Sequence, residues 1–150
     1  MIKRANNKKK KGFTLIELII VLAVMAIIAL IAIPNFAAVR NNSKNKADLQ
    51  SCETIKRTVL MLVSDETVTV TAGTEISFTP ETDITDNDTN GLSKEEAKKI
   101  DEALKEVKAP QGNKIVSTDG TEPTDAANGC DKYSITINDG EVVVKTVAKK

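Results

Sequence analysis

A long and almost entirely apolar run near the N-terminus constrains this chain more than any other feature. Residues 13–33 are apolar except Thr14 and Glu17, and 16 consecutive apolar residues run from Leu18 to Ile33. A helix needs about 20 apolar residues to cross a hydrocarbon core about 30 Å thick. The run therefore predicts a helix that crosses a membrane once.

The charges around this run predict its orientation. Six basic residues and no acidic residue precede Gly12, although the 150-residue chain carries 21 basic and 21 acidic residues in all. Positively charged flanks stay in the cytoplasm, so we expect a cytoplasmic N-terminus and a body outside the membrane. A cleaved secretory signal would have a shorter apolar region and small residues at its end. This run ends instead at Ile33-Pro34-Asn35, which disfavours that alternative.

The helix is expected to continue past the apolar run. Pro34 lacks an N–H donor and clashes with the preceding turn, which predicts a kink. From Phe36 to Val63 there is no glycine and no proline, and apolar residues recur every three or four positions. The stripe consists of Leu49, Cys52, Ile55, Val59 and Leu62. Such spacing is typical of an amphipathic helix, so one helix is expected from residue 13 to about residue 64.

A second, shorter helix is expected in the remaining chain at about residues 93–108. Ser93 and Glu96 form a capping-box pattern at its start. Its apolar face would consist of Ala97, Ile100, Ala103, Leu104 and Val107. The stretch before it, 81–91, is acidic and rich in turn residues, which predicts a loop.

Several strand patterns follow the long helix. Alternating or β-branched residues predict short strands at 67–71, 75–79 and 113–117. Two β-branched runs flank Asn138-Asp139-Gly140, which predicts a hairpin at about 131–147. The fold class is therefore α+β, with one long helix packed on a small antiparallel sheet.

The composition disfavours several functions. The chain has no histidine and no tryptophan, and one tyrosine. Without histidine, neither a His-dependent catalytic site nor a His-ligated zinc site can be built. Nucleic-acid binding would require a basic stripe with stacking aromatic residues, which is missing. We therefore expect no enzyme, no cofactor and no nucleic-acid partner.

The segment KGFTLIE, residues 11–17, and the apolar run behind it resemble the class III signal sequence of type IV pilins. The resemblance is direct over residues 8–36, and the rest of the chain agrees in architecture alone. It implies the pilin fold and, more narrowly, a major pilin. Pilins of the Gram-negative type usually close a C-terminal loop with two nearby cysteines. Only Cys130 lies in that region here, which suggests the clostridial type.

The resemblance implies a processing route and a division of the chain. A membrane prepilin peptidase would cut between Gly12 and Phe13, and the new amine of Phe13 would be N-methylated. The chain would then consist of a cleaved leader (1–12), a filament-core helix (13–34), the amphipathic half of that helix (35–64) and a globular head (65–150). Glycine suits the cleavage site because a backbone without a side chain can approach catalytic groups closely.

Glu17 is expected to direct assembly. An acid in an apolar helix is costly, and less so when it is paired in a dry environment. In the family, the glutamate of an incoming subunit pairs with the terminal amine of a neighbour, so Glu17 would set the axial register of the filament.

The implied partners are further copies of the chain in a helical homopolymer, the prepilin peptidase, an assembly ATPase, membrane platform proteins and minor pilins. The precursor would lie in the cytoplasmic membrane. The assembled form would be a surface pilus used for adhesion, aggregation, biofilm formation or twitching motility. Two alternatives remain: a major pseudopilin of type II secretion, and a single-pass membrane-anchored binding protein.

Two smaller features leave alternatives open. Cys52 and Cys130 allow one disulfide in an exported chain, or two buried thiols. Asp86, Asp88 and Asn90 match the start of an EF-hand-like calcium loop, whose twelfth position is Ala97 instead of an acid. An acidic, solvated loop before the second helix explains the same residues.

Overall fold

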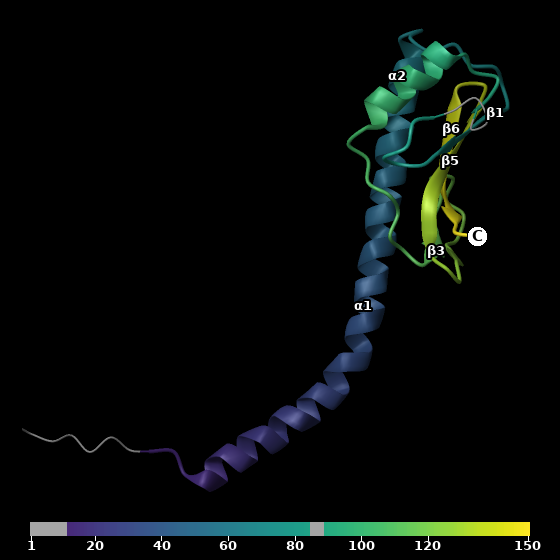
Figure 1. Cartoon of the computed structure of the whole chain (residues 1–150). Coiled ribbons are helices and arrows are strands. Elements are labelled where there is room, and N and C mark those ends of the chain that lie inside the picture. The colour runs from purple at the N-terminus through teal and green to yellow at the C-terminus, as the bar shows by residue number, and fades with distance from the viewer. Residues whose placement is uncertain (1–11, 85–88) are drawn as a thin grey trace, which may run out of the picture. The chain divides into compact units, whose positions relative to one another are not determined.

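The computed structural model describes residues 12–84 and 89–150, without the side chains of Pro34, Asn35 and Thr89. Its elements in chain order are α1 (Leu15–Ser64), β1 (Thr74–Phe78), β2 (Thr89–Asn90), α2 (Lys94–Leu104), β3 (Lys114–Ile115), β4 (Thr124–Asp125), β5 (Cys130–Asn138) and β6 (Glu141–Ala148) (Figure 1). The chain divides into two compact units, Met1–Ala38 and Val39–Lys150. A long helix followed by an antiparallel sheet confirms the α+β class and the pilin fold.

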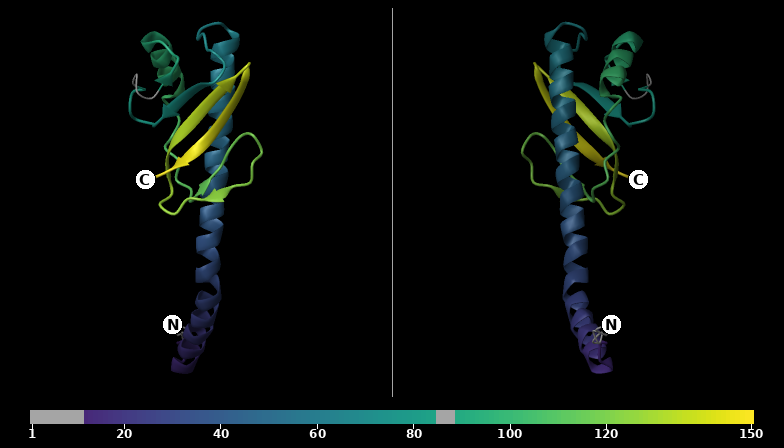
Figure 2. Two further views of the ribbon diagram at one scale, coloured as in Figure 1. Left: turned by 90° about the vertical axis from the view of Figure 1, so that its right-hand side faces the viewer. Right: turned by 90° about the vertical axis from the view of Figure 1, so that its left-hand side faces the viewer.

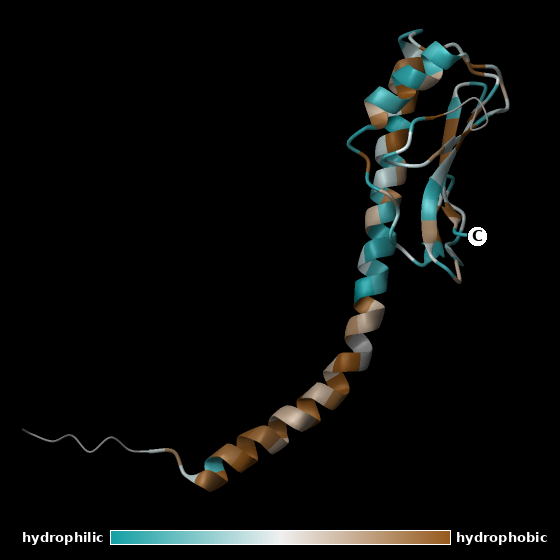
Figure 3. Ribbon diagram, in the orientation of Figure 1, coloured by the Kyte–Doolittle hydropathy of each residue, from teal (hydrophilic) through white to brown (hydrophobic). Residues whose placement is uncertain are grey.

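The part of α1 that lies in the first unit carries the apolar run. Every side chain from residue 13 to residue 33 is exposed, and Figure 3 shows this stretch as almost uniformly hydrophobic. By length and composition, α1 is able to cross a membrane. The helix includes Pro34, but the proline ring lies outside the described side chains, so the kink stays a prediction.

In the second unit, α1 lies along one face of the sheet, as both views of Figure 2 show. An apolar cluster fills the space between them, and the side chains of Asn45, Asp48, Thr74, Ser134 and Thr146 are also buried in this unit. The apolar cluster consists of Cys52, Ile55, Val59, Val68, Ile76, Phe78, Ile100, Leu104, Val116, Tyr133, Ile135, Ile137, Val142 and Val144. Leu49 was expected on this helix face but is 38% exposed. The inward position one turn before Cys52 belongs to Asp48, which is 4% exposed.

The main sheet has the strand order β2-β1-β5-β6 and is antiparallel throughout. The predicted hairpin forms one side of this sheet: Ile135 of β5 pairs with Val144 of β6, and Ile137 with Val142. Asp139 and Gly140 both have positive φ, 43° and 83°. A two-residue turn with both residues left-handed matches the twist of the flanking strands, which explains the Asp-Gly sequence.

One predicted strand, 67–71, is wrong. Its alternating Thr and Val residues suggested a ladder, but the described backbone there forms turns and coil. The amides of Thr67 and Val68 bond to the carbonyl of Leu62 at the end of α1, and the amide of Thr69 donates to Glu96 Oε1 at 2.8 Å. The segment therefore closes the end of one helix and the start of another. The strand expected at 113–117 shrinks to the two residues of β3.

The second helix forms as predicted but is shorter, and one residue of its expected face is wrong. Ser93 is its N-cap and makes the complete capping box with Glu96. The helix ends at Leu104, where the Val107 amide closes a turn onto the Leu104 carbonyl. Ala97, Ile100 and Leu104 are buried, whereas Ala103, which was expected on the same face, is exposed to solvent.

Candidate functional site

The predicted cleavage site lies immediately before α1. Gly12 and Phe13 are both exposed, and the Phe13 side chain is 91% exposed. Among the described residues, 12–84 and 89–150, a Cβ added at Gly12 would meet no atom within 4 Å, and the φ of Gly12 lies outside the left-handed range. Packing against this part of the chain therefore does not require glycine at position 12.

Glu17 has a partner inside its own chain. Thr14 donates to Glu17 Oε2 twice, from its amide at 3.1 Å and from its hydroxyl at 2.9 Å. The Glu17 amide donates back to Thr14 Oγ1 at 3.3 Å. These reciprocal bonds form a capping box, which satisfies free amides at the start of a helix. The role of Thr14 was not predicted, although the pattern T-x-x-E before an apolar run is the signal that identifies such a box.

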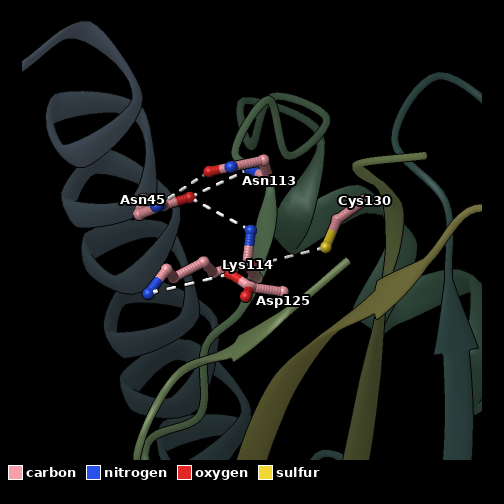
Figure 4. A network of polar contacts seen from close by, with 5 residues as sticks. All are labelled: Asn45, Asn113, Lys114, Asp125 and Cys130. Carbon is pink, nitrogen blue, oxygen red and sulfur yellow. Dashed lines mark hydrogen bonds and ion pairs between the residues drawn. The ribbon is translucent and has the colours of Figure 1, made fainter. Parts of the chain in front are cut away.

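Two polar side chains on α1 hold a loop of the second unit. Asp48 accepts from the amide of Gln111 at 3.0 Å and from that of Gly112 at 2.7 Å. Asn45 Oδ1 accepts from the next two amides, Asn113 at 3.0 Å and Lys114 at 3.2 Å. We name this arrangement of Asn45, Asp48 and the backbone of 111–114 the loop anchor. Figure 4 shows its Asn45 half, beside the Lys114–Asp125 ion pair of 3.8 Å.

Gly112 is required by the loop anchor. A Cβ at this position would overlap Asn45 Oδ1 and lie 2.6 Å from Asp48 Oδ2. The amides can therefore reach both acceptors only because residue 112 has no side chain. No periodic pattern in the sequence links residues 45–48 to 111–114, so the anchor could not be predicted.

Both cysteines lie in the core of the second unit as free, buried thiols. Cys130 Sγ donates to the Lys114 carbonyl at 3.4 Å. Burial, and after it the negative charge of Asp48, raises the pKa of Cys52 to about 12. Burial likewise raises the pKa values of Cys130 and Tyr133. The disulfide between the two cysteines stays a prediction.

These raised pKa values predict a loss of stability in alkali. Above pH 9 the unfolded chain ionises its cysteines while the folded chain keeps Cys52 neutral, so the unfolded state binds fewer protons and gains stability. The free energy of unfolding should therefore fall as the pH rises from about 9 to about 12. Urea titrations of the full chain in detergent at pH 7, 9 and 10.5 measure this.

The matched variant for this prediction is Cys52→Ala, whose decline should be smaller, with a remainder from Tyr133 and Cys130. An equal decline in both proteins would contradict the assignment to Cys52.

The disulfide between Cys52 and Cys130 is tested separately. Alkylation in urea without reductant, followed by mass spectrometry, gives two labels for free thiols and none for a disulfide.

Of the three residues predicted to bind calcium, one lies in the described part of the chain. Asp86 and Asp88 lie outside it, and Asn90 is an exposed residue of β2. Within residues 12–84 and 89–150, no group of three or more acidic or cysteine side chains is placed to hold a metal ion.

Comparison with known proteins agrees with the motif at the N-terminus. The family described as "Prokaryotic N-terminal methylation motif" matches residues 7–33. The "Prepilin peptidase-dependent protein A" of Clostridium perfringens (strain 13 / Type A) is 37% identical over 112 residues, which cover 74% of this chain and 78% of that protein. No solved structure matches the chain. With this motif, this relative and this fold, the chain belongs to the type IV pilin family.

Proposed function

We propose that this protein is the major structural subunit of a type IV pilus. The observation that carries the proposal is the helix segment 13–33, which is apolar on every side and exposed throughout, with a single carboxylate at Glu17. A helix that is hydrophobic all round must be covered, either by lipid or by other helices. A filament subunit meets both conditions in turn.

Prepilin peptidase removes residues 1–12 in this proposal. The matched relative is named as dependent on that peptidase. The exposed Gly12–Phe13 bond precedes the first turn of α1 and is accessible without unfolding the helix. Because no packing contact with the described residues explains glycine there, we attribute the requirement to the peptidase that binds this segment. Methylation of the new Phe13 amine follows.

Thr14 and Glu17 give this segment two states. In the uncut chain, Glu17 is held by the Thr14 amide and hydroxyl, which lowers the cost of placing an acid in an apolar helix. Cleavage creates a positive amine one residue before Thr14. The carboxylate then pairs with the amine of a neighbouring subunit, where a dry core makes an unpaired charge costly.

The exposed apolar side chains supply the cohesion of the filament. Burying one large apolar side chain stabilises by about 1.5 to 3 kcal/mol, so a bundle of such segments is held by tens of kcal/mol in water. In lipid the same association gains little, because acyl chains are as apolar as leucine. Extraction therefore needs external work, for which we propose a cytoplasmic ATPase acting with membrane platform proteins and minor pilins.

In this proposal the precursor lies in the cytoplasmic membrane with its basic N-terminus inside. The assembled pilus extends from the cell surface and serves adhesion, aggregation or twitching motility.

Substitution of Gly12 tests the processing step. Gly12→Val should block cleavage, because a β-branched side chain keeps the backbone away from the catalytic groups of the peptidase. Mass spectrometry of the membrane fraction should show a chain that still begins at residue 1 or 2, whereas the wild-type chain begins at a methylated Phe13. The matched control, Ala38→Val, changes an exposed helix residue and should be processed normally.

Electron microscopy of a deletion strain tests the rest of the proposal. Loss of surface pili supports a major pilin. Normal pili in the deletion strain, or a wild-type chain that starts at Met1, would refute it.

A further inference from the structure

The exposed side of α1 in the second unit carries uncompensated positive charge. Residues 39–64 contain five basic and two acidic residues, and one of the acids, Asp48, is buried in the loop anchor. The basic residues are Arg40, Lys44, Lys46, Lys56 and Arg57, of which Lys44 and Lys56 are half-buried. Within the described chain, none of the five forms an ion pair. The remaining acid, Glu53, is half-buried.

Two of these residues, Lys46 and Arg57, form a stripe directed away from the core, which we name the basic face. Lys46 and Arg57 are both exposed and 11 residues apart. Eleven residues return to nearly the same side of an α-helix, about 20° away and about 16 Å along its axis. Cys52 and Ile55 lie on the opposite side against the sheet, and the right-hand view of Figure 2 shows α1 in front of that sheet.

A second surface of the same unit has the opposite charge. Residues 115–131 include four acidic residues and no basic one. Asp119 and Glu122 lie on the exposed connection between β3 and β4, and Asp125 ends β4, where it forms an ion pair with Lys114 at 3.8 Å. We name residues 117–125 the acidic loop; it lies at the rim of the unit (Figure 2).

The acidic loop has a defined conformation. Asp119 Oδ1 accepts from the Thr121 amide at 2.9 Å and its hydroxyl at 2.7 Å. The base of the loop is tied to β6, because the Thr118 amide donates to the Val144 carbonyl and the Thr118 hydroxyl accepts from the Val144 amide, both at 2.9 Å. A loop already ordered before binding loses little entropy when it docks.

We propose that the acidic loop of one subunit docks on the basic face of α1 in a second copy of this chain. The two surfaces are different and complementary, so the contact is head-to-tail. Head-to-tail contacts that do not close into a ring continue as helical filaments. The inference rests on the proposed function. It adds a contact between the second units (Val39–Lys150) of two subunits, distinct from the contact through the apolar helix segment.

Charge reversal on either surface tests the contact in cells that assemble the full chain. Lys46→Glu/Arg57→Glu should lower the yield of sheared pili by about tenfold, because like charges would then lie opposite each other in the contact. Glu122→Lys leaves both the Asp119 turn and the Lys114–Asp125 ion pair in place and should lower the yield severalfold. A chain with all three substitutions should recover part of the yield lost in the Lys46→Glu/Arg57→Glu variant, because each subunit then presents both reversed surfaces.

The control for the helix variant is Lys108→Glu/Lys149→Glu. It makes the same change in net charge as Lys46→Glu/Arg57→Glu, at exposed positions outside both surfaces, and should assemble normally. Processed subunit in the membrane, measured by mass spectrometry, shows whether each variant folds. If the Lys46→Glu/Arg57→Glu variant is degraded, the acidic-loop variant becomes the test: loss of pili supports the contact, and normal pili contradict it.

Unchanged yields for both the Lys46→Glu/Arg57→Glu variant and the Glu122→Lys variant would overturn the contact. So would a helix variant that fails to assemble and is not rescued by the loop reversal, since the basic face would then serve an anionic partner other than this chain. If the wild-type chain forms no pili, the proposed function fails; if it forms pili that ignore these charges, only this contact fails.

Discussion

Replacing Glu17 by alanine should reduce the yield of pili by at least about a hundredfold while the precursor is still cut and methylated. Removing one partner of a buried ion pair leaves an uncompensated charge, which costs about 3 to 5 kcal/mol. In the filament this cost would recur at every subunit, at the methylated amine of Phe13. The measurement is the amount of sheared filament per cell, normalised to processed subunit in the membrane.

Two matched variants separate the charge of Glu17 from its role in the capping box. Glu17→Gln keeps a side chain that can cap the helix with Thr14 but carries no charge, so it should assemble as poorly as Glu17→Ala. Thr14→Ala removes the cap and keeps the charge. Its cost should be about 1 kcal/mol, with assembly largely retained. If the Glu17→Gln variant formed pili at the wild-type level, the carboxylate would be a helix cap and the intersubunit pair would be refuted.

Removal of the Asp48 carboxylate should lower the free energy of unfolding of the full chain in detergent by about 3 kcal/mol. Asp48→Ala leaves the amides of Gln111 and Gly112 without their acceptor. A hydrogen bond to a charged group contributes about 1.5 to 3 kcal/mol, and an unsatisfied buried donor costs a similar amount. Urea unfolding followed by circular dichroism gives the difference directly.

Glu53→Ala is the control for Asp48, since it removes a carboxylate from the same helix and no described hydrogen bond. It should change the free energy of unfolding by less than about 0.5 kcal/mol. Gly112→Ala approaches the same anchor from the loop and should be comparably destabilising, because its Cβ would overlap Asn45 Oδ1. A stable Asp48→Ala protein would mean that water replaces the carboxylate and that the anchor is not needed.

Local patterns predicted the parts of this fold that depend on local physics. The hairpin around Asp139 and Gly140 could be predicted because only certain residues accept two left-handed conformations in succession. The capping box at Ser93 could be predicted because its two bonds join residues three apart. The strand expected at 67–71 was wrong because alternation of Thr and Val says nothing of which neighbour will accept the amides. Here the carbonyl of Leu62 and the carboxylate of Glu96 do so.

By itself the sequence determined the family and the proposed processing segment, because KGFTLIE and its apolar run act through residue type and spacing along one helix. It also determined that Glu17 needs a partner, since an acid in such a run is costly. The tertiary structure alone decided what lies opposite residues 45–48 and why residue 112 must be glycine. It also decided that the basic face of α1 and the acidic loop are both exposed. The loop anchor depends on segments more than 60 residues apart coming into contact, and no periodicity within either segment records its partner.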